Sequence, residues 1–292
     1  MKIWLIVGIF LVICVALWIS QPLLLPQDKI VFLDIGQGDS ILIQSGMQQV
    51  LIDGGSGAQV LPKLAEEMPW FDRKIDVIIS THPDKDHMGG LLEVVRRYKV
   101  GLLLLPPVPT STQIQTVWLN ELQNQVKAGK LQYRFAWRGD ELDVGRNLKL
   151  RMVSPTQSII DSLYGQTNDG SIVARADMNG LSVLLTGDLE MPVEKQLIAA
   201  NDDRLLDVDV LKVGHHGSKY STGSDFLAAT SPGLAAISVG AKNSYGHPTA
   251  ETLGRLADAH VPTLRTDLLG SIRLLYKNQR WLLSCETKLC MN

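Results

Sequence analysis

Cysteine is scarce in this 292-residue chain, and neither sign of charge dominates it. The three cysteines lie in an N-terminal apolar run and near the C-terminus, which argues against a cysteine nucleophile. A formal charge of −2 provides no bulk attraction for nucleic acid, so a polyanionic substrate would have to be held by local groups or by metal. Global charge therefore neither supports nor excludes a nuclease.

The motifs of several common hydrolase and nucleotide-binding classes are also absent. The sequence contains no G-x-S-x-G elbow, no Walker loop and no H-E-x-x-H helix, and it has neither a solenoid-length repeat nor a low-complexity tract. A composition of 45% apolar and 20% charged residues is that of a folded, core-bearing protein.

The N-terminal segment, residues 1–25, differs from the rest. From Ile3 to Ile19 the chain has 17 uncharged residues preceded by Lys2, close to the shortest run that spans a bilayer as a helix. The run exceeds a typical signal-peptide core and no small-x-small pair follows it, which favours an uncleaved membrane anchor over a cleaved secretory signal or a buried core helix. Lys2 then places the N-terminus in the cytoplasm and the catalytic domain outside.

The C-terminal tail, residues 285–292, contains Cys285 and Cys290. In an oxidising compartment these two cysteines could form a disulfide. Two free thiols are the alternative, because spacing alone does not establish disulfide geometry.

Residues 26–284 have the pattern of one folded domain. Short runs rich in Ile and Val, each ended by Gly or a polar turn residue, predict strands at IVFLDIG, SILIQSG, QVLIDGG, DVIISTH, GLLLL, LQYRFAW, NLKLRMVSP, SIVARAD, LSVLLTGD, DVDVLKVG and GLAAISVG, with two more closing the domain. Helices are predicted over residues 89–98, 112–127, 192–200, 224–230 and 249–259. Asn179-Gly180 predicts a tight hairpin. Hairpins and meanders with helices between them predict two sheets packed face to face with helices outside, an α+β four-layer sandwich.

The segment THPDKDHMGG, residues 81–90, is the strongest chemical signal. It places His82, Asp84, Asp86 and His87 between an apolar strand and a helix. Two imidazoles and two carboxylates within six residues are costly to bury without a partner, and a divalent cation would satisfy all of them. A solvated acidic turn is the alternative.

Further candidate ligands follow later strands. They are Asp188, His215, His216 and His247, so that five of the six histidines lie in such motifs. A satisfied core histidine explains one such residue but not five, and chain segments ending on one sheet rim can converge on a metal pair.

In order, the motifs DIGQGDS, LIDGG, STHPDKDHMGG, NDGSIV, LLTGD, LKVGHHGSKYSTG, NSYGHP and RTDLLGSI resemble those of metallo-β-lactamase-fold hydrolases, in the ComEC competence-protein subgroup. The resemblance covers nearly all of residues 30–281. It implies an αβ/βα sandwich with a one- or two-metal site at the edge of the sheets.

The same resemblance implies which residues bind the metal. The matching ligands are His82, Asp86, His87, Asp188 and His215, with Asp188 shared between two ions. The sequence departs from the pattern twice, because Asp84 replaces a histidine as a ligand, and Thr167, Asn168 and Asp169 stand where another histidine is common. Harder donors favour Mn²⁺ or Mg²⁺ over Zn²⁺ at that position, so we expect one or two divalent ions, Zn²⁺ or Mn²⁺.

Other groups are expected to hold the ligands or to contact substrate. Asp53 matches an aspartate that orients the histidine loop, while Asp34, Gln37 and Asp39 suit the site edge or an ordinary turn. Ser218 and its neighbours suit a phosphate, although N-capping explains Ser221 or Thr222 equally well. The full set is Asp34, Gln37, Asp39, Asp53, Asn168, His216 and Ser218.

These residues predict metal-assisted hydrolysis. Asp86 or Asp84 would orient a water whose pKa the metal lowers, and His247 and Lys219 would stabilise charge on a phosphoryl or acyl oxygen. The ComEC resemblance implies a phosphodiester substrate, single-stranded DNA first among them, and a DNA-uptake channel protein as partner. The alternatives are another hydrolase on this fold, acting on a lactone, a cell-wall ester or a nucleotide, and a non-catalytic partner of such a channel.

Overall fold

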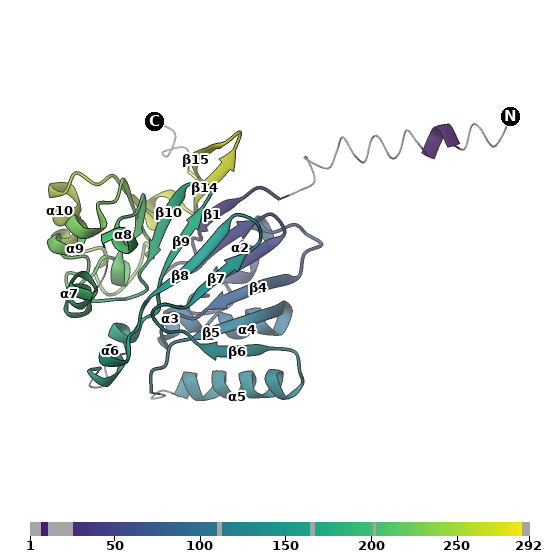
Figure 1. Cartoon of the computed structure of the whole chain (residues 1–292), viewed down its shortest axis with the longest axis horizontal. Helices are drawn as coiled ribbons and strands as arrows, with labels where there is room; N and C mark the ends of the chain where they lie inside the picture. The colour runs from purple at the N-terminus through teal and green to yellow at the C-terminus, as the bar shows by residue number, and fades with distance from the viewer. Residues whose placement is uncertain (1–6, 11–25, 110–112, 164–166, 201–202, 288–292) are drawn as a thin grey trace.

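The computed structural model describes residues 7–10, 26–109, 113–163, 167–200 and 203–287. Over these residues, fifteen strands form one sheet of eight and one of seven, and the sheets pack face to face with helices on their outer sides (Figure 1). The α+β sandwich predicted from the sequence is thereby confirmed.

The first sheet has the strand order β15-β14-β1-β2-β3-β4-β5-β6. Strands β1 to β3 form an antiparallel meander, and β3 to β6 run parallel. The bounds are β1 (Lys29–Phe32), β2 (Ile41–Ser45), β3 (Gln48–Ile52), β4 (Lys74–Ile79), β5 (Lys99–Leu105), β6 (Gln132–Phe135), β14 (Ile272–Lys277) and β15 (Arg280–Cys285). The parallel connections contain α2 (Val60–Glu67), α3 (Lys85–Met88), α4 (Leu91–Arg97) and α5 (Gln113–Lys127).

The second sheet has the order β13-β12-β11-β10-β9-β8-β7. Strands β7 to β10 pair antiparallel, and β10 to β13 pair parallel. The strands are β7 (Glu141–Val144), β8 (Leu148–Ser154), β9 (Val173–Met178), β10 (Leu181–Leu185), β11 (Val210–Lys212), β12 (Leu234–Ile237) and β13 (Thr263–Arg265). The helices are α6 (Gln157–Asp161), α7 (Met191–Ala200), α8 (Asp203–Leu206), α9 (Ser224–Thr230), α10 (Ala250–Asp258) and α11 (Thr266–Leu269), with 3-10 turns η1 (Asn168–Gly170) and η2 (Gly214–Gly217).

Local sequence explains the antiparallel part of this sheet. Asn179 and Gly180 join β9 to β10 with φ angles of 49° and 78°. Two successive positive φ values belong to a turn whose twist matches that of the flanking strands, and Asn-Gly tolerates them best. The predicted hairpin is therefore present.

Three apolar layers stabilise the sandwich. Residues such as Ile43, Ile79 and Leu185 fill the space between the two sheets. A second cluster lies between the first sheet and α2, α4 and α5, and a third lies between the second sheet and its helices. Strands buried on both faces carry near-continuous apolar runs, which is why they were recognisable in the sequence.

The predictions made for the two ends of the chain fall largely outside the described residues. The proposed anchor, residues 3–19, falls outside the described residues except for 7–10, which are helical. In the part of the chain that is described, no helix has both the length and the apolar character needed to cross a bilayer. Cys285, the last residue of β15, is disulfide-bonded, and its predicted partner Cys290 lies outside the described residues.

Candidate metal centre

One edge of the sandwich collects the polar side chains that follow strands of both sheets. Asp53 follows β3 and Thr81 follows β4 in the first sheet, while Asp188 follows β10 and His215 and His216 follow β11 in the second. The carboxyl ends of parallel neighbouring strands meet at the same edge, which brings residues distant in sequence together. The candidate metal ligands therefore lie at one edge of the sandwich, between the two sheets.

Asp53 fixes the histidine loop. It has a φ of 57° directly after β3 and is fully buried. Its carboxylate accepts hydrogen bonds from the Thr81 backbone N–H, at 2.8 Å, and from Thr81 Oγ1, at 2.6 Å. One of its oxygens also lies 2.8 Å from His87 Nδ1. This contact orients the His87 ring so that Nε2 faces Asp188, as expected of a residue that supports a ligand.

Four buried side chains converge at the centre of the site. The ligand atoms of Asp39, His87, Asp188 and His216 all lie within 4.8 Å of one another. His87 Nε2 is 3.2 Å from Asp188 Oδ1 and 3.2 Å from His216 Nε2. His216 Nδ1 lies 2.9 Å from the Ser238 carbonyl oxygen, which fixes that ring as well. We refer to these four residues as the central cluster.

Asp86 lies beside the central cluster. Its Oδ2 is 3.4 Å from His216 Nε2. The loop before β2 approaches Asp86 closely, since a Cβ added at Gly38 would lie 2.1 Å from the Asp86 carbonyl oxygen. Glycine at that position, with a φ of 119°, lets the loop carry Asp39 into the cluster.

The two adjacent histidines of η2 differ in position. Both have left-handed backbone conformations, with φ angles of 46° for His215 and 53° for His216. His216 is buried inside the central cluster, whereas His215 is partly exposed, with Nε2 3.7 Å from Asp188 Oδ2 and Nδ1 3.1 Å from Glu190 Oε1. The structure therefore places the predicted ligand His215 at the rim of the cluster and places His216 at its centre.

A second group lies on the other side of Asp188. His82 is fully buried, with Nε2 3.8 Å from Asp188 Oδ2 and 3.9 Å from Asp84 Oδ2. Asp84 accepts a hydrogen bond from Thr167 Oγ1 at 3.1 Å, just before η1, which contains Asn168 and Asp169. The segment in which a further histidine is common thus approaches the site with oxygen donors. Asp188 lies between this group and the central cluster.

Lys212 was not identified from the sequence. It is the last residue of β11, is 1% exposed, and places Nζ 2.6 Å from Asp39 Oδ2 and 2.9 Å from the Gly187 carbonyl oxygen. In the sequence, Lys212 is the single charged residue of the apolar strand run LKVG. A lone charge in a strand of this kind could have indicated a buried ion pair. Its ammonium compensates part of the negative charge of the buried carboxylates.

The protonation equilibria of the site reflect its mixture of burial and charge. Burial opposes ionisation of Asp188, but His216 and His87 hold its pKa well below the usual range. Burial likewise opposes protonation of His87, but the carboxylates of Asp188 and Asp53 raise its pKa well above the usual value. Burial and the neighbouring His87 lower the pKa of His82. His82 thus presents a neutral imidazole and Asp188 a carboxylate, the forms that bind a cation.

The donor set fits a divalent metal ion. His82 Nε2 and Asp39 Oδ1 are buried atoms that have no hydrogen-bond partner among the described residues. Buried polar atoms without partners are costly, and a cation would satisfy them. Imidazole nitrogens with carboxylate oxygens suit Zn²⁺ and Mn²⁺ alike.

The remaining predicted residues lie farther from the central cluster, and among them His247 lies beside His215. The His247 ring centroid lies 5.5 Å from that of His215, and Tyr245 stacks on His247 at 5.8 Å. Lys219 is exposed and places Nζ 5.0 Å from the Tyr220 ring centroid. Other predicted residues form loop contacts: Asp34 accepts a hydrogen bond from the Gly36 N–H, Gln37 Oε1 from the Gly240 N–H, and Ser218 Oγ from the Tyr220 N–H.

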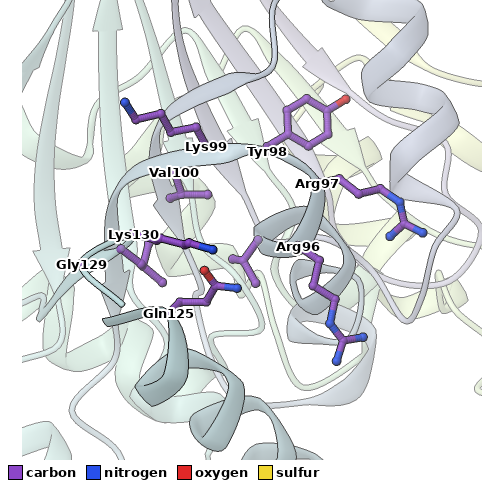
Figure 2. A pocket seen from close by; sticks show the side chains of 10 residues that line it. Arg96, Arg97, Tyr98, Lys99, Val100, Gln125, Gly129 and Lys130 are labelled. Carbon is purple, nitrogen blue, oxygen red and sulfur yellow. The ribbon is translucent and has the colours of Figure 1, made fainter. Parts of the chain in front are cut away.

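Cavities lie both near the site and away from it. One cavity, of about 450 Å³, is lined by basic side chains including Arg96, Arg97, Lys99 and Lys130 (Figure 2). It lies at the start of β5, whereas the metal residues follow the opposite end of the neighbouring β4. A smaller cavity of about 280 Å³ borders Asp86 directly. The cavity that borders Asp86 therefore adjoins the metal site.

Comparison with known families assigns the fold. The model of the Metallo-beta-lactamase superfamily matches residues 33–241. A metallo hydrolase from Ignicoccus hospitalis has a similar solved structure, with a TM-score of 0.54 and 14% identity over 85% of this chain and 100% of that chain. At that level of identity the likeness concerns the fold alone.

Two curated relatives point to one subgroup. ComE operon protein 3 of Bacillus subtilis is 32% identical over 88% of this chain and 34% of its own length. Competence protein ComA of Neisseria gonorrhoeae is 30% identical over 82% of this chain and 31% of its own length. The chain thus spans about a third of the length of these relatives. The resemblance inferred from the order of motifs is confirmed.

Proposed function

This chain belongs to the metallo-beta-lactamase superfamily, and from that premise we propose that it is a metal-dependent hydrolase of the ComEC type that cleaves phosphodiester bonds. The supporting observation is the convergence of Asp39, His87, Asp188 and His216, with His82, Asp84 and Asp86 beside them. Single-stranded DNA is the leading substrate, and the names of the curated relatives suggest DNA uptake as the setting.

The residues that would hold the metal divide into two groups around Asp188. His87, His216, Asp86 and Asp39 surround one position, and His82 with Asp84 faces another. When bound there, a divalent cation supplies Lewis acidity and lowers the pKa of water. His215 Nε2, 3.7 Å from Asp188 Oδ2, is a further candidate ligand.

The protein's own groups would orient the reactants and move protons. Burial raises the pKa of Asp84, which makes this carboxylate a better proton acceptor than an ordinary aspartate. Burial and the neighbouring His215 and His216 lower the pKa of His247, so its ring is neutral and can donate one hydrogen bond to a phosphoryl oxygen. Lys219, which is exposed, would approach the same charge from solvent.

The proposal also includes the cellular location. We propose that residues 1–25 tether the chain to a membrane with the hydrolase domain on the extracytoplasmic side, where a DNA-uptake channel protein would deliver the strand. The disulfide at Cys285 suits an oxidising compartment.

The test is a substrate screen with defined metals. Full-length protein in mild detergent is stripped with a chelator, reloaded with Mn²⁺, Zn²⁺ or Mg²⁺, and assayed on single-stranded DNA, bis(p-nitrophenyl) phosphate, a lactone and a nucleotide. We expect metal-dependent cleavage of both phosphodiesters. His216→Ala should abolish it, and His260→Asn, at an exposed histidine outside the site, should not. Hydrolysis of the lactone alone would contradict the proposal, and strand binding without any hydrolysis would indicate a non-catalytic partner.

A further inference from the structure

The cavity that borders Asp86 shares a wall with the metal site. One side is formed by the histidine loop and the β1–β2 loop, and the other by the loop after β12. Because Asp86 belongs both to this wall and to the surroundings of His216, a molecule in the cavity would lie beside the metal site. The lining residues are Gln37, Ser56, Lys85, Asp86, Lys242, Asn243, Ser244 and Tyr245.

Two lysines give the cavity a local positive charge. Lys85 and Lys242 are both exposed, and neither forms an ion pair with any carboxylate in the described parts of the chain. Other cations near the same sheet do have such partners, for example Lys63 with Glu286 and Arg97 with Glu93. The Asp86 carboxylate itself faces His216. Two uncompensated ammonium groups lining one small cavity suit a bound anion such as a phosphate diester.

The loop that carries Lys242 is held in place by its own polar contacts. Asn243 Nδ2 donates to the carbonyl oxygens of Gly240, at 2.9 Å, and His247, at 2.7 Å. Asn243 Oδ1 accepts from the backbone N–H groups of Tyr245 and His247. A loop fixed in this way presents its side chains to a ligand without first having to become ordered.

A row of rings leads from the central cluster to the cavity. Ring centroids are 6.2 Å apart for His216 and His215, 5.5 Å for His215 and His247, and 5.8 Å for His247 and Tyr245. Tyr245 and His247 are nearly parallel, at 24°, and Tyr245 is 66% exposed. An exposed flat ring beside unpaired cations is the combination that binds a base together with its phosphate.

We propose that this cavity binds one nucleotide of a single-stranded nucleic acid next to the bond that is cleaved. Lys85 and Lys242 hold its phosphate, and Tyr245 stacks on its base. This inference rests on the proposed function and deepens it, since it assigns the residues that recognise the strand. Two local lysines provide the attraction that a chain with a net charge of −2 lacks as a whole.

Binding and cleavage are measured separately. Affinity of the metal-loaded, full-length protein is followed by fluorescence anisotropy with a labelled single-stranded phosphorothioate oligonucleotide, which resists cleavage, over a range of salt concentrations. The variants are Lys85→Ala with Lys242→Ala, Tyr245→Ala and Tyr245→Phe. The matched control is Lys99→Ala with Lys130→Ala, which removes the same charge from the remote cavity of Figure 2.

The double variant Lys85→Ala/Lys242→Ala is expected to bind about 10–100-fold more weakly and to reduce the salt slope by about 1–2, because two phosphate contacts are lost. Tyr245→Ala should weaken binding about 5–100-fold, and Tyr245→Phe should retain it, because the ring supplies the stacking. The kcat/KM for an ordinary oligonucleotide should fall more than that for bis(p-nitrophenyl) phosphate. The control pair should bind as the wild type does.

Equal affinity and salt slope in the wild type and the Lys85/Lys242 variant would overturn the assignment, as would an equal loss in the control pair. These outcomes are distinct from failure of the proposed function. A protein that binds the strand through these lysines but cleaves no phosphodiester retains the subsite and loses the hydrolase proposal. A protein that cleaves bis(p-nitrophenyl) phosphate but binds the strand independently of the lysines retains the hydrolase proposal and loses the subsite.

Discussion

Asp188 is the residue at which the two groups of candidate ligands meet. Its Oδ2 lies 3.4 to 3.8 Å from nitrogen atoms of His216, His215 and His82, and its Oδ1 lies 3.2 Å from His87. In the described parts of the chain, the Asp84 carboxylate contacts His82, at 3.9 Å, and Thr167, at 3.1 Å. We therefore expect different consequences from removing the carboxylate of Asp188 and that of Asp84.

We expect Asp188→Ala to abolish hydrolysis at every metal concentration, because both metal positions lose a ligand. Asp84→Ala should weaken metal affinity by about 10–100-fold, and added Mn²⁺ should restore part of the rate. Both variants are assayed across a metal titration, with folding checked by circular dichroism. Equal, metal-insensitive losses would identify Asp84 as a catalytic base, and full activity in Asp188→Ala would end the metallohydrolase proposal.

Lys212 leads to a prediction about stability rather than turnover. Lys212→Met would leave Asp39 buried without its 2.6 Å partner. Removing one member of a buried ion pair costs about 3–5 kcal/mol in the free energy of unfolding, so the metal-free variant should unfold at clearly lower urea concentration. Lys219→Met, at an exposed lysine, is the control. Adding Asp39→Asn to Lys212→Met should recover part of the loss, and no recovery would mean that the charge of Asp39 is not the cause.

At single positions, the sequence predicted residue types better than it predicted arrangement. The motif order identified both histidines of HHGS and gave the ligand role to His215, whereas the structure places His216 in the central cluster, because the ring positions depend on two consecutive left-handed backbone conformations. Asp39 was expected at the site edge, yet it lies in the centre through the close approach at Gly38. Close contacts between loops that are distant in sequence cannot be predicted from the local sequence pattern.

At the scale of elements, the turn after η2 depends on a buried carboxylate from α7. Glu194 is 2% exposed and accepts hydrogen bonds from the backbone N–H groups of Thr222 and Gly223. Burial raises the pKa of Glu194 to about 7. The two N–H donors favour the charged carboxylate and lower the pKa, but their effect is smaller than that of burial. The turn that follows the candidate histidines is therefore sensitive to proton binding.

The sign of this effect follows from linkage. Because the folded-state pKa of Glu194 is raised, its contribution to stability is fully present below the unfolded-state value of about 4.5 and is lost as the pH rises through about 7. Glu194→Gln should lose less free energy of unfolding than the wild type between about pH 5 and about pH 8, measured in urea. Glu251→Gln, at an exposed position on α10, serves as control. Parallel pH profiles for the wild type and Glu194→Gln would contradict the prediction.

Strands with long apolar runs and helices with clear periodicity were predicted close to their observed bounds. The helix expected over residues 89–98 begins instead at Leu91, because the glycine pair before it packs against another loop. A Cβ at Gly90 would lie 2.0 Å from the Gly54 carbonyl oxygen. Helix α2 and the mostly exposed strand β7 were missed, since short segments carry too few periodic residues.

At the scale of the whole molecule, Asp28 connects the two sheets. Its Oδ1 accepts a hydrogen bond from the Gly46 N–H in the β2–β3 turn, at 2.7 Å. Its Oδ2 accepts from Asn147, at 3.0 Å, and Asn179, at 2.7 Å, in two turns of the other sheet. Asp28, the first charged residue after the apolar segment, therefore links turns of both sheets.

Deleting residues 1–25 should leave the thermal midpoint of unfolding unchanged, because β1 begins at Lys29 and Asp28 is retained. Asp28→Ala in the same truncated protein should lower the free energy of unfolding by about 2–5 kcal/mol, since three hydrogen bonds to one carboxylate are lost. Differential scanning calorimetry measures both. Aggregation of the truncated protein alongside an active full-length chain would show that the first 25 residues belong to the fold.

The order of the strands within each sheet was not predictable from the sequence. The approximate number of strands and their arrangement in two packed sheets were predictable. Nothing in the local pattern of IVF indicates that β1 lies between β2 and β14, because its pairing depends on residues at the other end of the chain.

That position of β1 has a consequence during synthesis. Lys29 pairs opposite Leu275, so β1 keeps one unsatisfied backbone edge until the last hairpin has left the ribosome. At about 5–20 residues per second this interval is roughly 10–50 s. An apolar strand with a free edge is prone to pair with the same strand of another nascent chain. Cells that produce this protein at high rates therefore need to keep neighbouring nascent chains apart, and a lower expression level should raise the fraction of folded molecules.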